Sequence, residues 1–141
     1  MAAENSEIKY LFRGNSNYRD GPIGKALDMD ADEADIQNPA DHVLRKQSRL
    51  SSRYASFTTE VAIARSFTSA PDNRYIRKVD LKELRKLESN GRICLLDADR
   101  VYNELLMSDK KKLVRQAADV RAAMKRNNEV LIEGQIPPRH H

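Results

Sequence analysis

Near the C-terminus, a β-prone apolar run follows directly on a long and highly charged helical pattern, and this switch limits the possible folds more than any other feature of the chain. The run comprises Val130, Leu131, Ile132 and Ile136, and Glu129 stands at the junction, on the first residue of the predicted strand. A carboxylate in that position is held by a rigid element rather than by a loop, which suits a functional group. Glu129 is therefore a candidate site residue, whose role depends on which residues the fold places beside it.

Upstream of the junction, strand-like and helix-like segments alternate. Strands are predicted over residues 8–12, 52–59, 74–80 and 93–96. Helices are predicted over 39–50, 61–67, 81–87 and 98–126, the last interrupted at Ser108-Asp109, with a further short helix over 23–29 in an otherwise loop-like segment. The strands are short and their connections have hairpin length, so we predict an α+β fold rather than a doubly wound sheet. The length of 141 residues predicts a single domain, 1–141.

Several helix ends carry recognisable local signals. Asn38 is the expected N-cap of the helix that begins at Pro39. Asp80 and Glu83 resemble a capping box, and Asn90-Gly91 is typical of a helix end.

Composition excludes several classes of function. Lys and Arg outnumber Asp and Glu by 25 to 21, a mild basic bias that suits phosphate-bearing ligands or nucleic acid and is also ordinary for a soluble protein. The single cysteine, Cys94, excludes an internal disulfide, and its apolar neighbours predict that it is buried. No Cys/His cluster has metal-ligand spacing, no apolar run approaches membrane-spanning length, and the N-terminal residues do not resemble a signal peptide. We therefore expect a metal-free domain in a reducing, aqueous compartment.

Three short motifs that contain polar residues lie at the ends of predicted strands. They are Arg13-Gly14, then Ser56-Phe57-Thr58, then Glu129. Each has a structural alternative: a plain strand-end arginine, hydroxyls that cap the next helix, and a solvated glutamate. The glycine permits a sharp turn or a close approach of the backbone to a ligand.

Taken together, these pieces resemble the Arg-Ser-Glu class of mono-ADP-ribosyltransferase toxins, especially the C-terminal toxin domains of bacterial Rhs and other polymorphic toxins. Four short motifs fall in the family's order: Phe12-Arg13-Gly14, Tyr54-Ala55-Ser56-Phe57-Thr58, Ala64-Arg65-Ser66-Phe67, and Asn127 to Pro138. The resemblance implies a bent, split β-sheet core with flanking helices and an NAD-binding cleft, with NAD as substrate and no metal.

The resemblance also implies roles for individual residues. Glu129 would stabilise the positive charge that develops on the ribose when the nicotinamide bond breaks, as in other glycosyl transfers. Ser56 would hydrogen-bond Glu129 and fix its rotamer, and Arg13 would hold phosphate or ribose oxygens with its planar fork. The family assigns the remaining NAD contacts to residues that match Gly14, Tyr54, Phe57, Thr58 and Phe67. The aromatic ring of Phe67 would pack on the nicotinamide or fill the core.

One position departs from the family. The residue two before the catalytic glutamate is usually Glu or Gln and engages the acceptor, whereas here it is Asn127. The acceptor therefore stays open between a protein side chain and RNA, and the basic charge favours RNA slightly. A toxin of this kind would be secreted or delivered into the cytoplasm of a target cell, and its producer would need an immunity protein, which we expect to be acidic.

Two other classes of function compete with this reading. One is a non-catalytic basic module that binds RNA or a partner, although the lysines and arginines of the last helix also suit an ordinary solvated face. The other is a histidine-dependent nuclease, for which His42 is solitary and His140-His141 resemble a terminal tail.

Overall fold

The computed structural model describes residues 8–15, 23, 38–45, 54–68, 70 and 72–137. Most of the predicted helix over 23–29, the residues beyond Arg45 in the predicted helix over 39–50, and His140-His141 lie outside the described residues. The elements in chain order are β1 (Tyr10–Gly14), α2 (Pro39–Arg45), β2 (Tyr54–Thr58), α3 (Val61–Ser66), β3 (Ile76–Asp80), α4 (Leu81–Ser89), β4 (Ile93–Leu96), α5 (Ala98–Leu106), α6 (Lys111–Arg126) and β5 (Glu129–Gly134).

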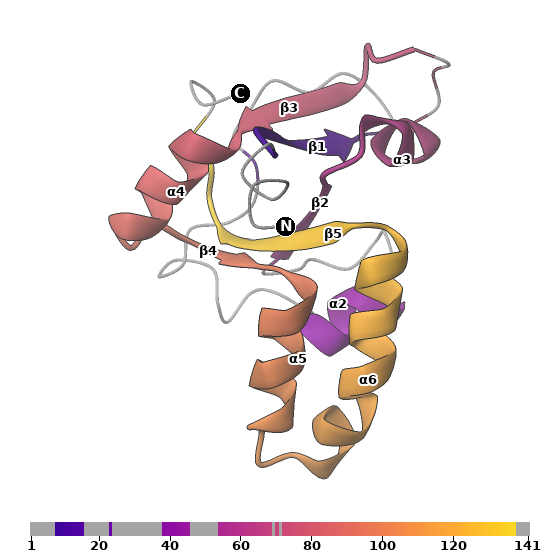
Figure 1. The fold of residues 1–141 in the computed structure, drawn as a ribbon, viewed down its shortest axis with the longest axis vertical. Coiled ribbons are helices and arrows are strands. Elements are labelled where there is room, and N and C mark those ends of the chain that lie inside the picture. Colours follow the sequence, from indigo (N-terminus) through magenta and orange to yellow (C-terminus); the bar gives the residue numbers. More distant parts are fainter. Residues whose placement is uncertain are drawn as a thin grey trace.

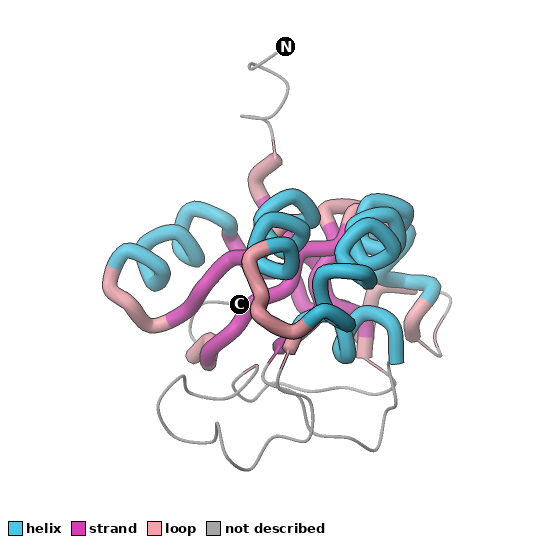
Figure 2. The backbone as a smooth tube through the Cα atoms, turned by 90° about the horizontal axis from the view of Figure 1, so that it is seen from below, coloured by secondary structure: helices cyan, strands magenta, loops and turns pink. Residues whose placement is uncertain are grey.

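The strands form one five-stranded antiparallel sheet in the order β3-β1-β2-β5-β4, flanked by the helices. The α+β prediction is therefore confirmed. In Figure 1, β1 and β3 lie at the top, β4 and β5 cross the middle, and β2 runs obliquely between the two groups. The α5–α6 hairpin projects away from the sheet, and Figure 2 looks roughly along the axes of its two helices.

The sheet is paired unevenly. β1 is paired with β3 along its whole length, and β2 with β5 likewise, but β1 and β2 meet at a single register pair, Phe12↔Thr58. We call this weakly paired boundary the seam. Arg13 and Gly14 lie on β1 just past that pair, and Glu129 is the register partner of Thr58 on the other side. The seam thus brings together the three polar motifs of the sequence.

Two apolar clusters cover opposite faces of the β2-β5-β4 half, because successive side chains of a strand point to opposite faces. On β5, Leu131 belongs to one cluster and Ile132 to the other. The first cluster also contains residues of α2, α5 and α6, and the second contains residues of α4, β1 and β3. Val120, Met124 and Leu131 are fully buried, and burial of side chains of this size contributes about 1.5–3 kcal/mol each. The α6–β5 junction is therefore anchored on both of its sides.

Local sequence signals correctly predicted several helix ends. The side-chain oxygen of Asn38 accepts a hydrogen bond from the Asp41 N–H (2.9 Å), and that of Asp80 accepts one from the Lys82 N–H (2.8 Å). Gly91 adopts a left-handed φ of 73° after α4. The expected interruption of the last helix separates α5 from α6.

Two expectations need correction. The first strand does not break at Arg13: β1 runs from Tyr10 to Gly14, because pairing with β3 continues to Gly14↔Ile76. Cys94 is half-buried rather than fully buried, because it lies on β4 at the edge of the sheet. Burial still raises the pKa of its thiol, with a further contribution from the charge of Glu133.

Candidate functional site

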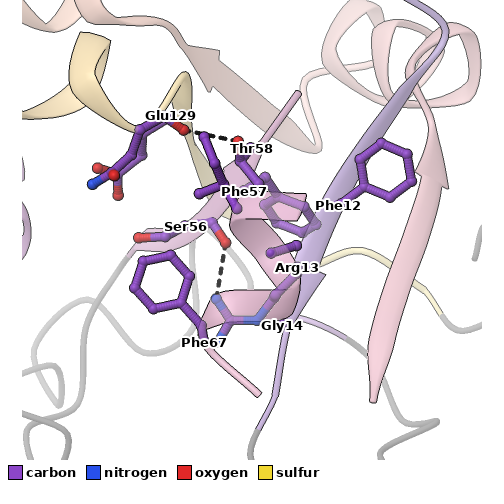
Figure 3. A pocket seen from close by; sticks show the side chains of 11 residues that line it. Phe12, Arg13, Gly14, Ser56, Phe57, Thr58, Phe67 and Glu129 are labelled. Carbon is purple, nitrogen blue, oxygen red and sulfur yellow. Dashed lines mark hydrogen bonds between the residues drawn. The ribbon is translucent and has the colours of Figure 1, made fainter. Parts of the chain in front are cut away.

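A pocket of about 200 Å³ opens at the seam (Figure 3). Eight of the nine residues predicted from the sequence line it: Arg13, Gly14, Ser56, Phe57, Thr58, Phe67, Asn127 and Glu129. Phe12, Ile63 and Ala64 complete the lining. The ninth, Tyr54, does not line this pocket and instead packs beside His42 and the apolar cluster of α2, α5 and α6.

Glu129 occupies the first residue of β5 and is only 5% exposed. The reading as a solvated glutamate is therefore wrong. The reversal from α6 into β5 depends on Asn128, which has a left-handed φ of 48°. Asparagine is one of the few residues that adopt this conformation readily. The side-chain oxygen Oε1 of Glu129 is buried at this turn, beside the wall of the pocket.

Two neighbouring threonines at the end of β2 hold the turn that carries Glu129. The hydroxyl of Thr58 donates to the carbonyl of Asn127 (2.8 Å), and the backbone N–H of Thr59 donates to the carbonyl of Asn128 (3.2 Å). The same Thr58 hydroxyl accepts the Glu60 N–H (3.1 Å) just before α3 begins. The N-cap of α3 is Glu60, with no side-chain cap, so the alternative that a β2 hydroxyl caps this helix is wrong. Thr58 instead ties β2 to the Glu129 junction.

Arg13 spans the seam. Its guanidinium donates to the backbone carbonyl of Ser56 (3.1 Å), where the ladder between β1 and β2 has already ended (Figure 3). Arg13 is half-buried, and its register partner on β3 is Arg77, which is also half-buried. Sequence patterns did not indicate Arg77, because the register of β1 with β3 is set by the fold.

Gly14 has a packing role that its motif did not reveal. A Cβ atom at this position would collide with the carbonyl oxygen of Ala64 in α3. The glycine therefore lets α3 lie directly against β1, which brings the end of α3 to the pocket. Contact of Gly14 with nicotinamide stays a prediction.

The two phenylalanines that line the pocket differ in burial. Phe57 is 2% exposed and belongs to the core beneath the pocket, whereas Phe67, at the C-terminal cap of α3, is 56% exposed. The core reading of Phe67 is therefore wrong, and its ring is accessible to a planar ligand.

The hydroxyl of Ser56 is bonded to a residue that the sequence did not connect with it. Ser56 Oγ lies 2.7 Å from Nε2 of His42, in α2, and the His42 ring stands edge-on to Tyr54 with centroids 5.9 Å apart. The expected bond from Ser56 to Glu129 stays a prediction, because Ser56 lies opposite Leu131 and diagonal to Glu129. No local motif links His42 to Ser56, so only the tertiary structure reveals the pair.

The pocket combines opposite charges in a confined space. An arginine lies on the β1 side and a buried carboxylate on the β5 side, with an exposed aromatic ring at the end of α3. Such a site suits a ligand that carries both an anionic group and a centre of developing positive charge. Among the described residues, no cluster of three His, Cys, Asp or Glu side chains is placed to hold a metal ion, and no helix is long and apolar enough to cross a membrane.

Comparison of the chain with protein-family models, with curated proteins and with solved structures finds no match.

Proposed function

We propose that the protein is an NAD-dependent mono-ADP-ribosyltransferase of the toxin type, with the seam pocket as its active site. The observation that carries the proposal is the convergence of Arg13, Ser56 and Glu129 on one pocket, from three separate strands. The resemblance of the sequence motifs concerns these same residues. The proposed fold is correspondingly the bent, split sheet of that family, and the weak pairing of β1 with β2 supports it.

The size of the pocket suggests how NAD would lie. Pockets that enclose a drug-sized ligand measure about 300–1,000 Å³, so a pocket of about 200 Å³ has room for one end of NAD. The nicotinamide and its ribose would enter beside Phe67 and Glu129. The pyrophosphate would extend toward the Arg13 side of the pocket, where the guanidinium can donate hydrogen bonds to phosphate oxygens.

The reaction would break the bond between ribose C1′ and the nicotinamide nitrogen. The bonding electrons leave with the nitrogen, which becomes neutral, while positive charge develops on the ribose. The buried Glu129 carboxylate would stabilise that charge more strongly than an exposed one, because water screens it less. A nucleophile of the acceptor then bonds to C1′ and loses its proton, so the products are ADP-ribosylated acceptor, nicotinamide and one proton.

The acceptor would be a macromolecule that approaches past Asn127, which lines the same pocket. The net charge of +4 slightly favours RNA over protein, since RNA is polyanionic. The proposal further includes delivery into the cytoplasm of a target cell and a neutralising acidic immunity protein in the producer.

The test is incubation of the protein and a cell lysate with NAD labelled in its ADP-ribose part. We expect labelled macromolecules with the wild type and none with Glu129→Gln. Loss of the label after RNase treatment identifies RNA as acceptor, and loss after protease treatment identifies protein. Intact NAD together with salt-sensitive RNA binding would instead establish the non-catalytic binding module.

A further inference from the structure

The hydrogen bond between His42 and Ser56 joins a residue that lines the proposed active site to one outside its lining. His42 belongs to α2, where Ala40 and Val43 are buried against α6 and the Asn38 cap fixes the N-terminal end. The Nε2–Oγ distance of 2.7 Å is that of a well-formed hydrogen bond. The imidazole is therefore held by packing and reaches Ser56 with a defined atom.

The direction of this bond decides what the Ser56 hydroxyl can do in the pocket. A serine hydroxyl has one hydrogen and two lone pairs, and a carboxylate only accepts hydrogen bonds. If Ser56 donated to His42, only its lone pairs would face the pocket, and they repel a carboxylate. If Nε2 of His42 carries a hydrogen and donates, the Ser56 hydrogen is left to point into the pocket.

Glu129 is the carboxylate that can use this hydrogen. Ser56 lines the pocket with Glu129, and the register places the two residues diagonally, because Ser56 lies opposite Leu131 and Thr58 opposite Glu129. Both residues are on the same face of the sheet, and diagonal neighbours in a sheet are about 7–8 Å apart. A glutamate side chain can span most of that separation.

We propose that His42 is a positioning residue, which donates from Nε2 to Ser56 Oγ and so directs the Ser56 hydroxyl hydrogen toward the Glu129 carboxylate. The functional part of this inference rests on the proposed ADP-ribosyltransferase activity. The arrangement of the hydrogen bonds does not rest on it, so the two can be tested separately.

The hydrogen-bond arrangement is tested by NMR of the imidazole nitrogens, in which a protonated and an unprotonated ring nitrogen give distinct ¹⁵N shifts. His42→Gln assigns the His42 signals. We expect a protonated Nε2 in the wild type, with a shift that changes in Ser56→Ala and in Glu129→Gln but not in Glu133→Gln, a control on the same strand. An unprotonated Nε2 would overturn the proposal, and so would His42 ¹⁵N shifts that do not change in Glu129→Gln. Both outcomes hold whether or not the protein consumes NAD.

The functional part is tested by NAD cleavage kinetics in a double-mutant cycle. His42→Leu should lower kcat about tenfold to a hundredfold with KM nearly unchanged, since it misplaces a group used in the transition state. His42→Gln, whose amide can still donate, should recover most of that loss. In a Ser56→Ala background, His42→Leu should cause no further loss.

Leu44→Ala, on the exposed side of the same helix, controls for general disturbance of α2. A role through Ser56 would be refuted if His42→Leu lowered kcat equally in the wild-type and Ser56→Ala backgrounds. It would also be refuted if His42→Gln lowered kcat as much as His42→Leu. Absence of NAD cleavage by the wild type would reject the proposed function, while the NMR result would still decide the hydrogen-bond arrangement.

Discussion

Two turns among the described residues reverse a helix directly into a strand of the same sheet, and they differ in the contacts that they make. After α4, Asn90-Gly91 leads into β4, and Gly91 is exposed, with open space where a Cβ atom would lie. After α6, Asn127-Asn128 leads into β5, and the carbonyls of both asparagines accept hydrogen bonds from the end of β2. The first turn only ends a helix, whereas the second is fixed to a neighbouring strand and places a buried carboxylate in a pocket.

This difference shows where a helix-to-strand turn acquires a function. Both turns need one left-handed residue, which is Gly91 in one and Asn128 in the other. The local backbone chemistry is thus nearly the same. The contrast comes from tertiary hydrogen bonds and from the residue after the left-handed one, which is the exposed Arg92 in the first turn and the buried Glu129 in the second.

The largest expected effect is the loss of the carboxylate at the functional turn. Glu129→Gln keeps the shape of the side chain and removes its charge, so NAD cleavage should fall about 10²–10³-fold or more. The thermal unfolding temperature should stay near that of the wild type. Glu133→Gln, on the same strand, should keep most of the activity; equal activities of the two variants would remove Glu129 from the site.

A smaller effect is expected when the turn is detached from β2. Thr58→Val removes the hydroxyl that bridges Asn127 and Glu60, which should cost about 1–3 kcal/mol of unfolding free energy. Displacement of Glu129 should also lower NAD cleavage, by up to about a hundredfold. The measurements are chemical denaturation and nicotinamide release.

Thr59→Val is the matched control for this substitution, because Thr59 holds Asn128 through its backbone N–H, which valine keeps. The control should retain both stability and activity. If Thr58→Val behaves like Thr59→Val, the hydroxyl does not position Glu129.

The left-handed residues themselves give a direct comparison of the two turns. Alanine pays a steric penalty of about 1–2 kcal/mol in this conformation, so Asn128→Ala and Gly91→Ala should destabilise the protein by similar amounts. Only Asn128→Ala should also reduce NAD cleavage. An equal loss of activity in both variants would mean that activity follows global stability rather than the geometry of the α6–β5 turn.

The smallest effect on activity is expected at Cys94, the reactive group that follows the α4 turn. Burial raises the pKa of this thiol, so the thiolate should be scarce at neutral pH and alkylation should be slow, accelerating only as the pH rises above the ordinary range of a cysteine. Cys94→Ala should leave NAD cleavage unchanged. Rapid labelling at pH 7 would contradict the raised pKa of the thiol. A loss of NAD cleavage in Cys94→Ala would contradict the view that the active site lies at β5 and not at β4.

The sequence predicted those parts of the structure that depend on local chemistry. The strand after the charged helix, the Asn38 and Asp80 caps and the Asn90-Gly91 helix end all follow from residue types at fixed spacing. Eight of the nine candidate site residues line one pocket, because their motifs lie at strand ends that the fold brings to one seam, while their roles stay predictions.

The remaining features depend on contacts between distant elements. His42 meets Ser56 because α2 packs on α6, and Arg77 lies opposite Arg13 because of the β1–β3 register. The need for glycine at position 14 comes from the backbone of α3. Tyr54 shares the motif of β2, yet it lies beside His42 rather than in the lining of the pocket. Strand motifs alone do not specify these arrangements.

The most direct test of the proposed active site is the release of nicotinamide from NAD by the purified protein, with and without cell lysate. We predict release by the wild type, at a rate that lysate increases by supplying the acceptor, and release reduced about 10²–10³-fold in Glu129→Gln. NAD that stays intact with the folded wild-type protein in the presence of lysate would contradict the proposal.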